Sequence, residues 1–156
     1  MSEIAEFDKY KKVQEKFNLP HLHDLRNTFK FELEDSDKLF DDIRTEISDR
    51  LFGFTEKILE PIIGGADSFC CMFEQDMVSD AERQKLFDLY AKIQVLKWEN
   101  NLLIVKPNDE ATAEWINKTW QLWNNELEQD LGKLCKKLSL AWKDLKLKEK
   151  KTHYTG

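Results

Sequence analysis

The stretch 116-INKTWQLWNNELEQDLGKLCKKLSLAWKDL-145 places an apolar residue at every third or fourth position without interruption. These residues are Ile116, Trp120, Trp123, Leu127, Leu131, Leu134, Leu138, Ala141 and Leu145. Their mean step is about 3.6 residues, the period of an α-helix with one buried face. The sequence therefore predicts one helix from residue 109 to about 146, roughly 55 Å long, capped by Asn108 or Asp109. Gly132, in its middle, is expected to mark a bend or a close helix crossing.

A second helix is predicted to begin near residue 80, because Ser79-Asp-Ala-Glu82 has the pattern of a capping box. It carries two apolar stripes on nearly opposite sides. One stripe is Leu86, Leu89, Tyr90, Ile93 and Leu96, and the other is Phe87, Ala91, Val95, Trp98 and Leu102. A helix that is apolar on two faces is buried on both, or offers one of them to another chain. We expect coverage within the chain, by residues 3–18 and 66–77.

The remaining pattern completes an all-α fold: an antiparallel bundle of about four helices with a long C-terminal helix. Residues 3–18 form a predicted helix ended by Leu19-Pro20. Another helix is expected from a cap at Asp35 or Ser36 to a stop at Pro61 and Gly64-Gly65, followed by a short helical turn within 66–76. Residues 21–33 are predicted to be irregular. Within them, 29–33 alternate like an extended segment, whose pairing with 102–105 is disfavoured.

Length and charge limit the classes of protein that fit. The 156 residues suit one domain, predicted at 1–147, with a flexible basic tail at 148–156. The sequence contains no run of about 20 apolar residues, so it predicts no membrane span. The three cysteines and the absence of a signal-peptide pattern favour an intracellular, cytoplasmic protein. The last 24 residues carry a net charge of +6, although the whole chain carries −6.

Motifs for chemistry are sparse. The five glycines form no phosphate-binding loop, and neither a nucleophile elbow nor a Glu-x-x-His pair occurs. His21-x-His23 is too small a cluster to predict a metal site. Three pairs of acids have one-turn spacing, which chance explains among 30 acidic residues: Glu3/Glu6, Glu34/Asp37 and Glu46/Asp49. We therefore predict no catalytic residue, no metal and no cofactor.

The cysteines and tryptophans are interpreted mainly as packing residues. Cys70 and Cys71 are expected to behave as small buried hydrophobes, and Cys135 to be half-buried. Trp120 and Trp123 fall on the core stripe. Trp98 and Trp142 lie off the main stripes, which makes them the candidates for exposed anchors at an interface.

These observations predict a non-catalytic helical interaction module, or a subunit of an intracellular assembly. Its partner would be another protein chain, either a second copy or a different protein. The candidate partner-binding residues are Phe87, Val95, Trp98, Leu102, Trp142, Lys146, Lys148, Lys150 and Lys151. Two alternatives stay open at this point. One is a Mg²⁺-dependent phosphohydrolase built on the acidic pairs, and the other is a nucleic-acid-associated accessory protein that uses the C-terminal lysines.

Overall fold

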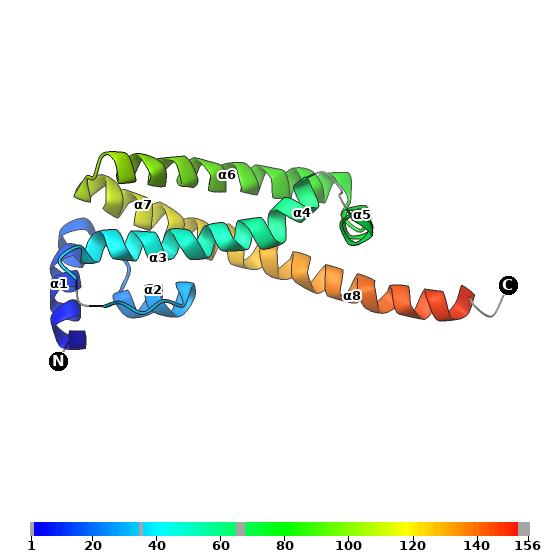
Figure 1. Ribbon diagram of the computed structural model, residues 1–156, viewed down its shortest axis with the longest axis horizontal. Coiled ribbons are helices and arrows are strands. Elements are labelled where there is room, and N and C mark those ends of the chain that lie inside the picture. Colours follow the sequence, from blue (N-terminus) through cyan, green and yellow to red (C-terminus); the bar gives the residue numbers. More distant parts are fainter. Residues whose placement is uncertain (1, 35, 65–67, 153–156) are drawn as a thin grey trace.

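The computed structural model describes residues 2–34, 36–64 and 68–152, with side chains between residues 8 and 145 of these ranges. No strand occurs in them, which confirms the all-α class (Figure 1). The elements are α1 (Ser2–Phe17), α2 (Leu22–Phe29), α3 (Leu39–Phe54), η1 (Thr55–Leu59), α4 (Glu60–Ile63), α5 (Phe69–Asp76), α6 (Asp80–Val105), α7 (Asp109–Leu122), η2 (Trp123–Leu127) and α8 (Glu128–Thr152). The turns η1 and η2 are π-helical: η1 joins α3 to α4, and η2 joins α7 to α8, without a break in the helix. The described residues therefore form six continuous helical runs rather than about four.

Three long runs lie side by side and make up most of the body. They are α3 with α4, α6 alone, and α7 with α8, and each contacts the other two. Helix α1 crosses one end of this body against α3 and α7, while α5 packs against α4 at the other end (Figure 1). The C-terminal part of α8 extends past the other helices.

The core lies between the three long runs and is apolar. Ile43 and Ile47 of α3, Ile93 of α6 and Ile116 of α7 have no exposed surface, and the Trp115 side chain is 1% exposed. On the α2 side, Trp123 packs its indole 5.8 Å from the ring of Phe29. The stripe from Ile116 along the C-terminal run and the first of the two stripes predicted for α6 thus contribute to the surfaces that meet.

Residues 21–33 are not irregular, because most of them form helix α2. Leu22, Leu25 and Phe29 are spaced three and four apart, so one face of the helix is buried against the body. The helix ends at Lys30, whose φ of 53° is a left-handed C-cap conformation. Residues 102–105, the disfavoured strand partner, belong to the last turn of α6.

The helix that contains α3 begins later than the sequence suggests and passes through Pro61, but it ends at Ile63, directly before the predicted stop at Gly64. Its N-cap is Lys38, and Ser36 contributes only a hydroxyl that accepts the backbone N–H of Lys38, at 3.0 Å. Asp35, the alternative cap, lies outside the described residues. Pro61 does not stop the helix, which continues to Ile63. In a regular helix, the ring of a proline clashes with the carbonyl four residues earlier. Here the π turn η1 ends two residues before Pro61, and its hydrogen bonds reach five residues back instead of four.

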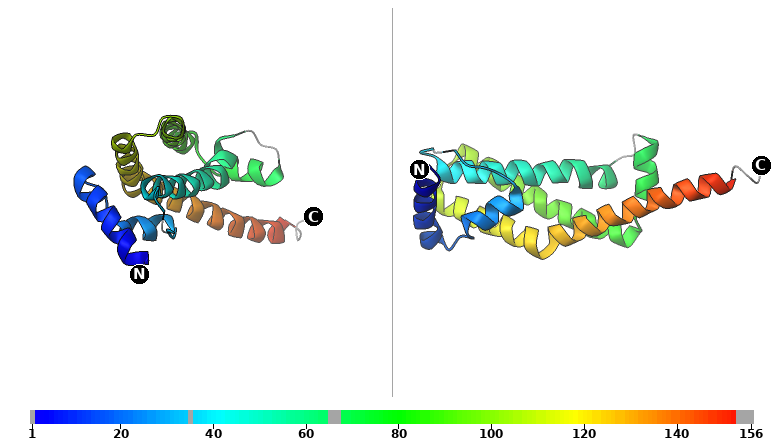
Figure 2. Two further views of the ribbon diagram at one scale, coloured as in Figure 1. Left: turned by 60° about the vertical axis from the view of Figure 1, so that its left-hand side comes forward. Right: turned by 90° about the horizontal axis from the view of Figure 1, so that it is seen from below.

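The long C-terminal run bends at η2 and not at Gly132. Figure 2 shows the change of direction where α7 passes into α8, and π turns are a recognised cause of such bends. Gly132 is exposed, and nothing lies within 4 Å of the position that a Cβ would take there. The expectation of a close crossing at Gly132 is therefore wrong.

Candidate interaction surface

The inner side of α6 is fixed to the body by buried polar contacts as well as by apolar packing. The guanidinium of Arg44 on α3 donates to the side-chain oxygen of Asn100, and both side chains are buried. The indole nitrogen of Trp115 on α7 donates to the backbone carbonyl of Leu96, at 2.8 Å. Because hydrogen bonds require defined geometry, these two contacts set the rotation of α6 about its own axis.

One flank of α6 is joined to the C-terminal run by ion pairs. Each pair joins a residue of α6 to one of α7, η2 or α8, and the residues on the two sides run in opposite order. The pairs are Glu82–Lys137 (2.6 Å), Lys85–Asp130 (3.5 Å), Lys92–Glu126 (2.8 Å) and Glu99–Lys118 (3.5 Å). Exposed pairs stabilise little individually, but their order fixes the register between the two antiparallel runs.

The N-terminus of α6 is capped as predicted. The Ser79 hydroxyl accepts the backbone N–H of Glu82, and the Glu82 carboxylate accepts the backbone N–H of Ser79 in return. The Lys137 ammonium and the Ser79 hydroxyl hold the pKa of Glu82 below its ordinary value. The first turn of α6 is thereby tied both to its own cap and to α8.

The side of α6 opposite its inner side is uncovered. This finding corrects the expectation that residues 3–18 and 66–77 pack over it. Helix α1 lies instead against α3 and α7, and α5 against α4. We call this side the outer face, made of Phe87, Ala91, Val95, Trp98, Leu102 and Val105. The exposed fractions are 49% for Phe87, 57% for Val95, 68% for Trp98, 59% for Leu102 and 75% for Val105. Ala91 is also exposed.

The outer face has the spacing of a helix-packing seam. From Ala91 to Val105 its members follow at intervals of four, three, four and three residues, a mean of 3.5. Two-stranded coiled coils repeat their apolar residues with this period. The side chains from Phe87 to Leu102 line a shallow hollow of about 620 Å³. Sequence reasoning left Val105 out, although it continues the spacing three residues after Leu102.

The edges of the outer face differ in charge. When the residues of α6 are placed around the helix axis at 100° per residue, charged side chains fall along one edge of the outer face and amide side chains along the other. The charged edge consists of Asp88, Lys92 and Glu99, and Lys106 follows it as the non-helical C-cap of α6. The amide edge consists of Gln94 and Asn101. Lys92 and Glu99 also belong to the ion pairs with the C-terminal run.

The other predicted partner-binding residues lie elsewhere. Trp142 on α8 is half-buried: its ring packs 4.4 Å from Phe73 of α5, and its indole nitrogen donates to Glu74 at 3.2 Å. It therefore holds α5 on the body and is not the exposed anchor that its spacing indicated. The side chains of Lys146, Lys148, Lys150 and Lys151 lie outside the described residues.

Helix α5 exposes groups that sequence reasoning placed in the interior. Cys70 is exposed and Cys71 is half-buried, so these cysteines are not the buried hydrophobes expected. Phe69 and Met72 are exposed on the same helix. Cys135 on α8 is exposed rather than half-buried. Each of these helices packs one face on the body: Cys70 and Cys135 point away from it, and Cys71 lies at its edge near Pro61.

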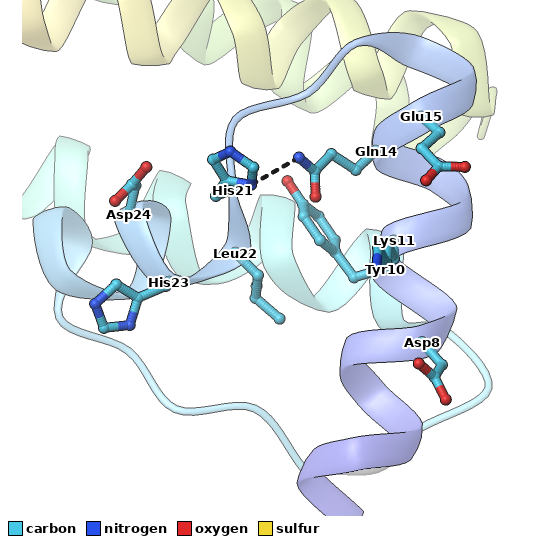
Figure 3. Close-up of a pocket in the computed structure, with 9 residues that line it drawn as sticks. All are labelled: Asp8, Tyr10, Lys11, Gln14, Glu15, His21, Leu22, His23 and Asp24. Carbon is cyan, nitrogen blue, oxygen red and sulfur yellow. Dashed lines mark hydrogen bonds between the residues drawn. The ribbon is translucent and has the colours of Figure 1, made fainter.

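A cavity of about 620 Å³ lies between α1 and the start of α2 and contains both predicted loop histidines (Figure 3). The amide of Gln14 hydrogen-bonds His21 at 2.9 Å, and His23 points away from His21 toward a bond with Asn27. The Tyr10 hydroxyl donates to the carbonyl of Pro20, at 2.5 Å. Burial raises the pKa of Tyr10, so this phenol keeps its proton and holds the loop after α1.

These positions do not gather ligands for a metal. Across residues 8–145, with the gaps noted above, no three His, Cys, Asp or Glu side chains come close enough to bind one ion. Glu46 and Asp49 are exposed on α3, and Glu34 and Asp37 are exposed on either side of the gap at residue 35. The side chains of Glu3 and Glu6 lie outside the described residues.

Comparison with known proteins adds no assignment. No family model matches the chain, and no curated protein or solved structure is significantly similar to it. Among the described residues, no helix is both long enough and apolar enough to cross a membrane.

Proposed function

We propose that the chain is a non-catalytic interaction module that binds a partner α-helix along the outer face of α6. One observation carries this proposal: six apolar side chains follow one another along a single helix face, and no element of the described chain covers them. Isolated exposed apolar residues are normal on a soluble protein, whereas a continuous apolar stripe marks an interaction site.

The spacing of the stripe supports a helix as the partner. A period of 3.5 residues keeps an apolar seam facing a second helix that crosses at a small angle. A β-strand partner would match a period of two instead. Trp98 lies near the middle of the seam and is 68% exposed, and interface hot spots favour tryptophan at central positions.

The contacts on the inner side of α6 also favour binding. Arg44–Asn100, the Trp115 indole and the ion pairs fix the position and rotation of the helix. A surface that is already ordered loses less conformational entropy when a partner binds. The outer face is therefore a rigid platform rather than a segment that folds on binding.

The test is site-directed photo-cross-linking in the source cell. Trp98 is replaced by the photo-reactive amino acid p-benzoylphenylalanine, which has a comparable aromatic surface. We expect irradiation to give a discrete covalent adduct with one protein, which mass spectrometry then identifies. Adding Val95→Glu to the same chain should abolish the adduct, because a carboxylate in the seam is costly to desolvate.

The matched control places the same amino acid at Leu140. This residue is about as exposed as Phe87, but it lies on α8, away from the seam. Equal adducts from positions 98 and 140, or none from position 98 in a folded chain, would contradict the proposal.

A further inference from the structure

We propose that the partner helix is α6 of a second copy of this chain, packed antiparallel about a two-fold axis midway between Val95 and Trp98. This inference rests on the proposed function, and it names the occupant of the same surface. A two-fold interface is self-complementary, so each residue must meet a suitable residue of the identical surface. The outer face meets this condition in both shape and charge.

The apolar side chains pair large with small. With the axis between Val95 and Trp98, Val95 faces Trp98 of the second copy, and Ala91 faces Leu102. Each pairing occurs twice because of the symmetry. Phe87 and Val105 of the second copy lie at each end, one residue step from level. Alternation of large and small residues lets two helices interdigitate without voids or overlap.

The charged edge is complementary under the same rotation. In an antiparallel pair like edges face each other, so Asp88 lies one residue step, about 1.5 Å, from the level of Lys106 of the second copy, within reach of the long lysine side chain. Lys92 of one copy lies two residue steps, about 3 Å, from the level of Glu99 of the other copy on the same edge. A contact there would extend the ion pairs that the two residues form with Glu126 and Lys118. Opposite charges across a helix pair determine partner choice and orientation.

A parallel arrangement lacks this complementarity. It would place Trp98 against Trp98, Asp88 against Asp88 and Lys106 against Lys106. Like charges in register are destabilising, and two tryptophans at one level overfill a seam that leaves a void at the level of Ala91. The order of residues along α6 therefore favours the antiparallel pair.

The surroundings of α6 leave room for a second helix. In Figure 1, α6 lies along one side of the body, and no other helix lies beyond it. The contact would consist of a single helix pair, which is smaller than a standard stable interface. We therefore expect a reversible, concentration-dependent dimer rather than a permanent one.

Light scattering coupled to size-exclusion chromatography tests the inference on the full chain in reducing buffer. We expect the mass to rise from 18.6 kDa toward twice that value as the concentration increases. Val95→Glu should weaken the dimer at least about a hundredfold, because each copy would bury an unpaired carboxylate against Trp98 of the other. Leu140→Glu, which adds the same charge outside the seam, should leave dimerisation unchanged.

A charge exchange tests the orientation. Asp88→Lys and Lys106→Asp should each weaken the dimer roughly tenfold, because each creates two like-charge contacts. When the two single variants are mixed, they should form a heterodimer. In it, each residue at position 88 again faces an opposite charge at position 106 of the other chain. The double variant D88K/K106D should recover wild-type affinity.

The outcomes separate this inference from the proposed function. A monomeric mass at every concentration up to a few hundred micromolar overturns the dimer, and so does a dimer that Val95→Glu leaves intact. Dimerisation that is insensitive to both single charge variants overturns the antiparallel orientation. A monomeric chain that still cross-links from position 98 to a different protein keeps the proposed function and rejects only the second copy.

Discussion

The two faces of α6 are nearly alike in composition and opposite in environment. Leu89 and Ile93 on the inner side are at most 2% exposed, whereas Val95 and Trp98 on the outer face are 57% and 68% exposed. Apolar character alone therefore does not decide which face meets the body. One difference between the faces is polar, since the inner side carries Asn100, which accepts from a buried arginine.

The largest expected effect comes from placing one charge on each face in turn. Ile93→Glu should lower the free energy of unfolding by several kcal/mol, out of a typical total of about 5–15 kcal/mol, because the carboxylate would be buried and unpaired. Val95→Glu should change it by less than about 0.5 kcal/mol, measured by urea unfolding at a concentration where the chain is monomeric. Equal destabilisation by both substitutions would mean that the outer face is covered.

The polar contact on the inner side is tested by removing one partner. Asn100→Ala should cost about 1.5–3 kcal/mol, because the Arg44 guanidinium would stay buried without its acceptor. The double substitution Arg44→Met with Asn100→Leu should recover most of this loss. Asn101→Ala, on the amide edge of the outer face, is the matched control and should cost far less. A small loss from Asn100→Ala would show that apolar packing alone fixes the rotation of α6.

The N-cap of α6 belongs to neither face of the helix. Its loss should therefore lower the stability of the fold without changing the dimer contact. Ser79→Ala removes the acceptor for the Glu82 backbone N–H and should cost about 1 kcal/mol. Thermal unfolding measures the loss, and the dimer mass of the folded protein should not change. An unchanged melting midpoint would show that the hydroxyl contributes nothing to the start of α6.

The smallest expected effect concerns the ion pair between Glu82 of α6 and Lys137 of α8, and it depends on pH. The pKa of Glu82 is lowered, chiefly by Lys137, so its contribution to stability is present above its ordinary pKa. That contribution is lost as the pH falls through the lowered value. Glu82→Gln should therefore lower the melting temperature slightly at neutral pH, and the difference should vanish in acid. Lys137→Met should have the same effect, and combining the two substitutions should add nothing further.

The sequence predicted the fold class and the long helices because their apolar spacing is regular. It missed α2, whose eight residues hold only three stripe positions, Leu22, Leu25 and Phe29. A helix this short is stabilised by tertiary packing rather than by propensity, so its own pattern is weak. The continuation of the helix through Pro61 was missed for another reason: a π turn leaves no composition signal.

The candidate surface was predicted in part. The stripe from Phe87 to Leu102 was recognised, but its exposure was not, because coverage depends on where α1 and α5 dock. Their docking is determined by contacts between distant residues, such as Trp142 with Glu74 and Phe73. Trp142 itself shows the limit of spacing arguments, since an off-stripe tryptophan can serve a neighbouring helix as well as solvent.

The short connection between α6 and α7 has a consequence for folding kinetics. Only residues 106–108 separate the two helices, and the Trp115–Leu96 hydrogen bond spans 19 positions, whereas Arg44–Asn100 spans 56. Contacts between residues close in sequence lose less loop entropy on formation, and chains rich in them fold faster. We expect this helical hairpin to be structured in the folding transition state, with α3 docking later, so Trp115 should give higher φ-values than Ile43.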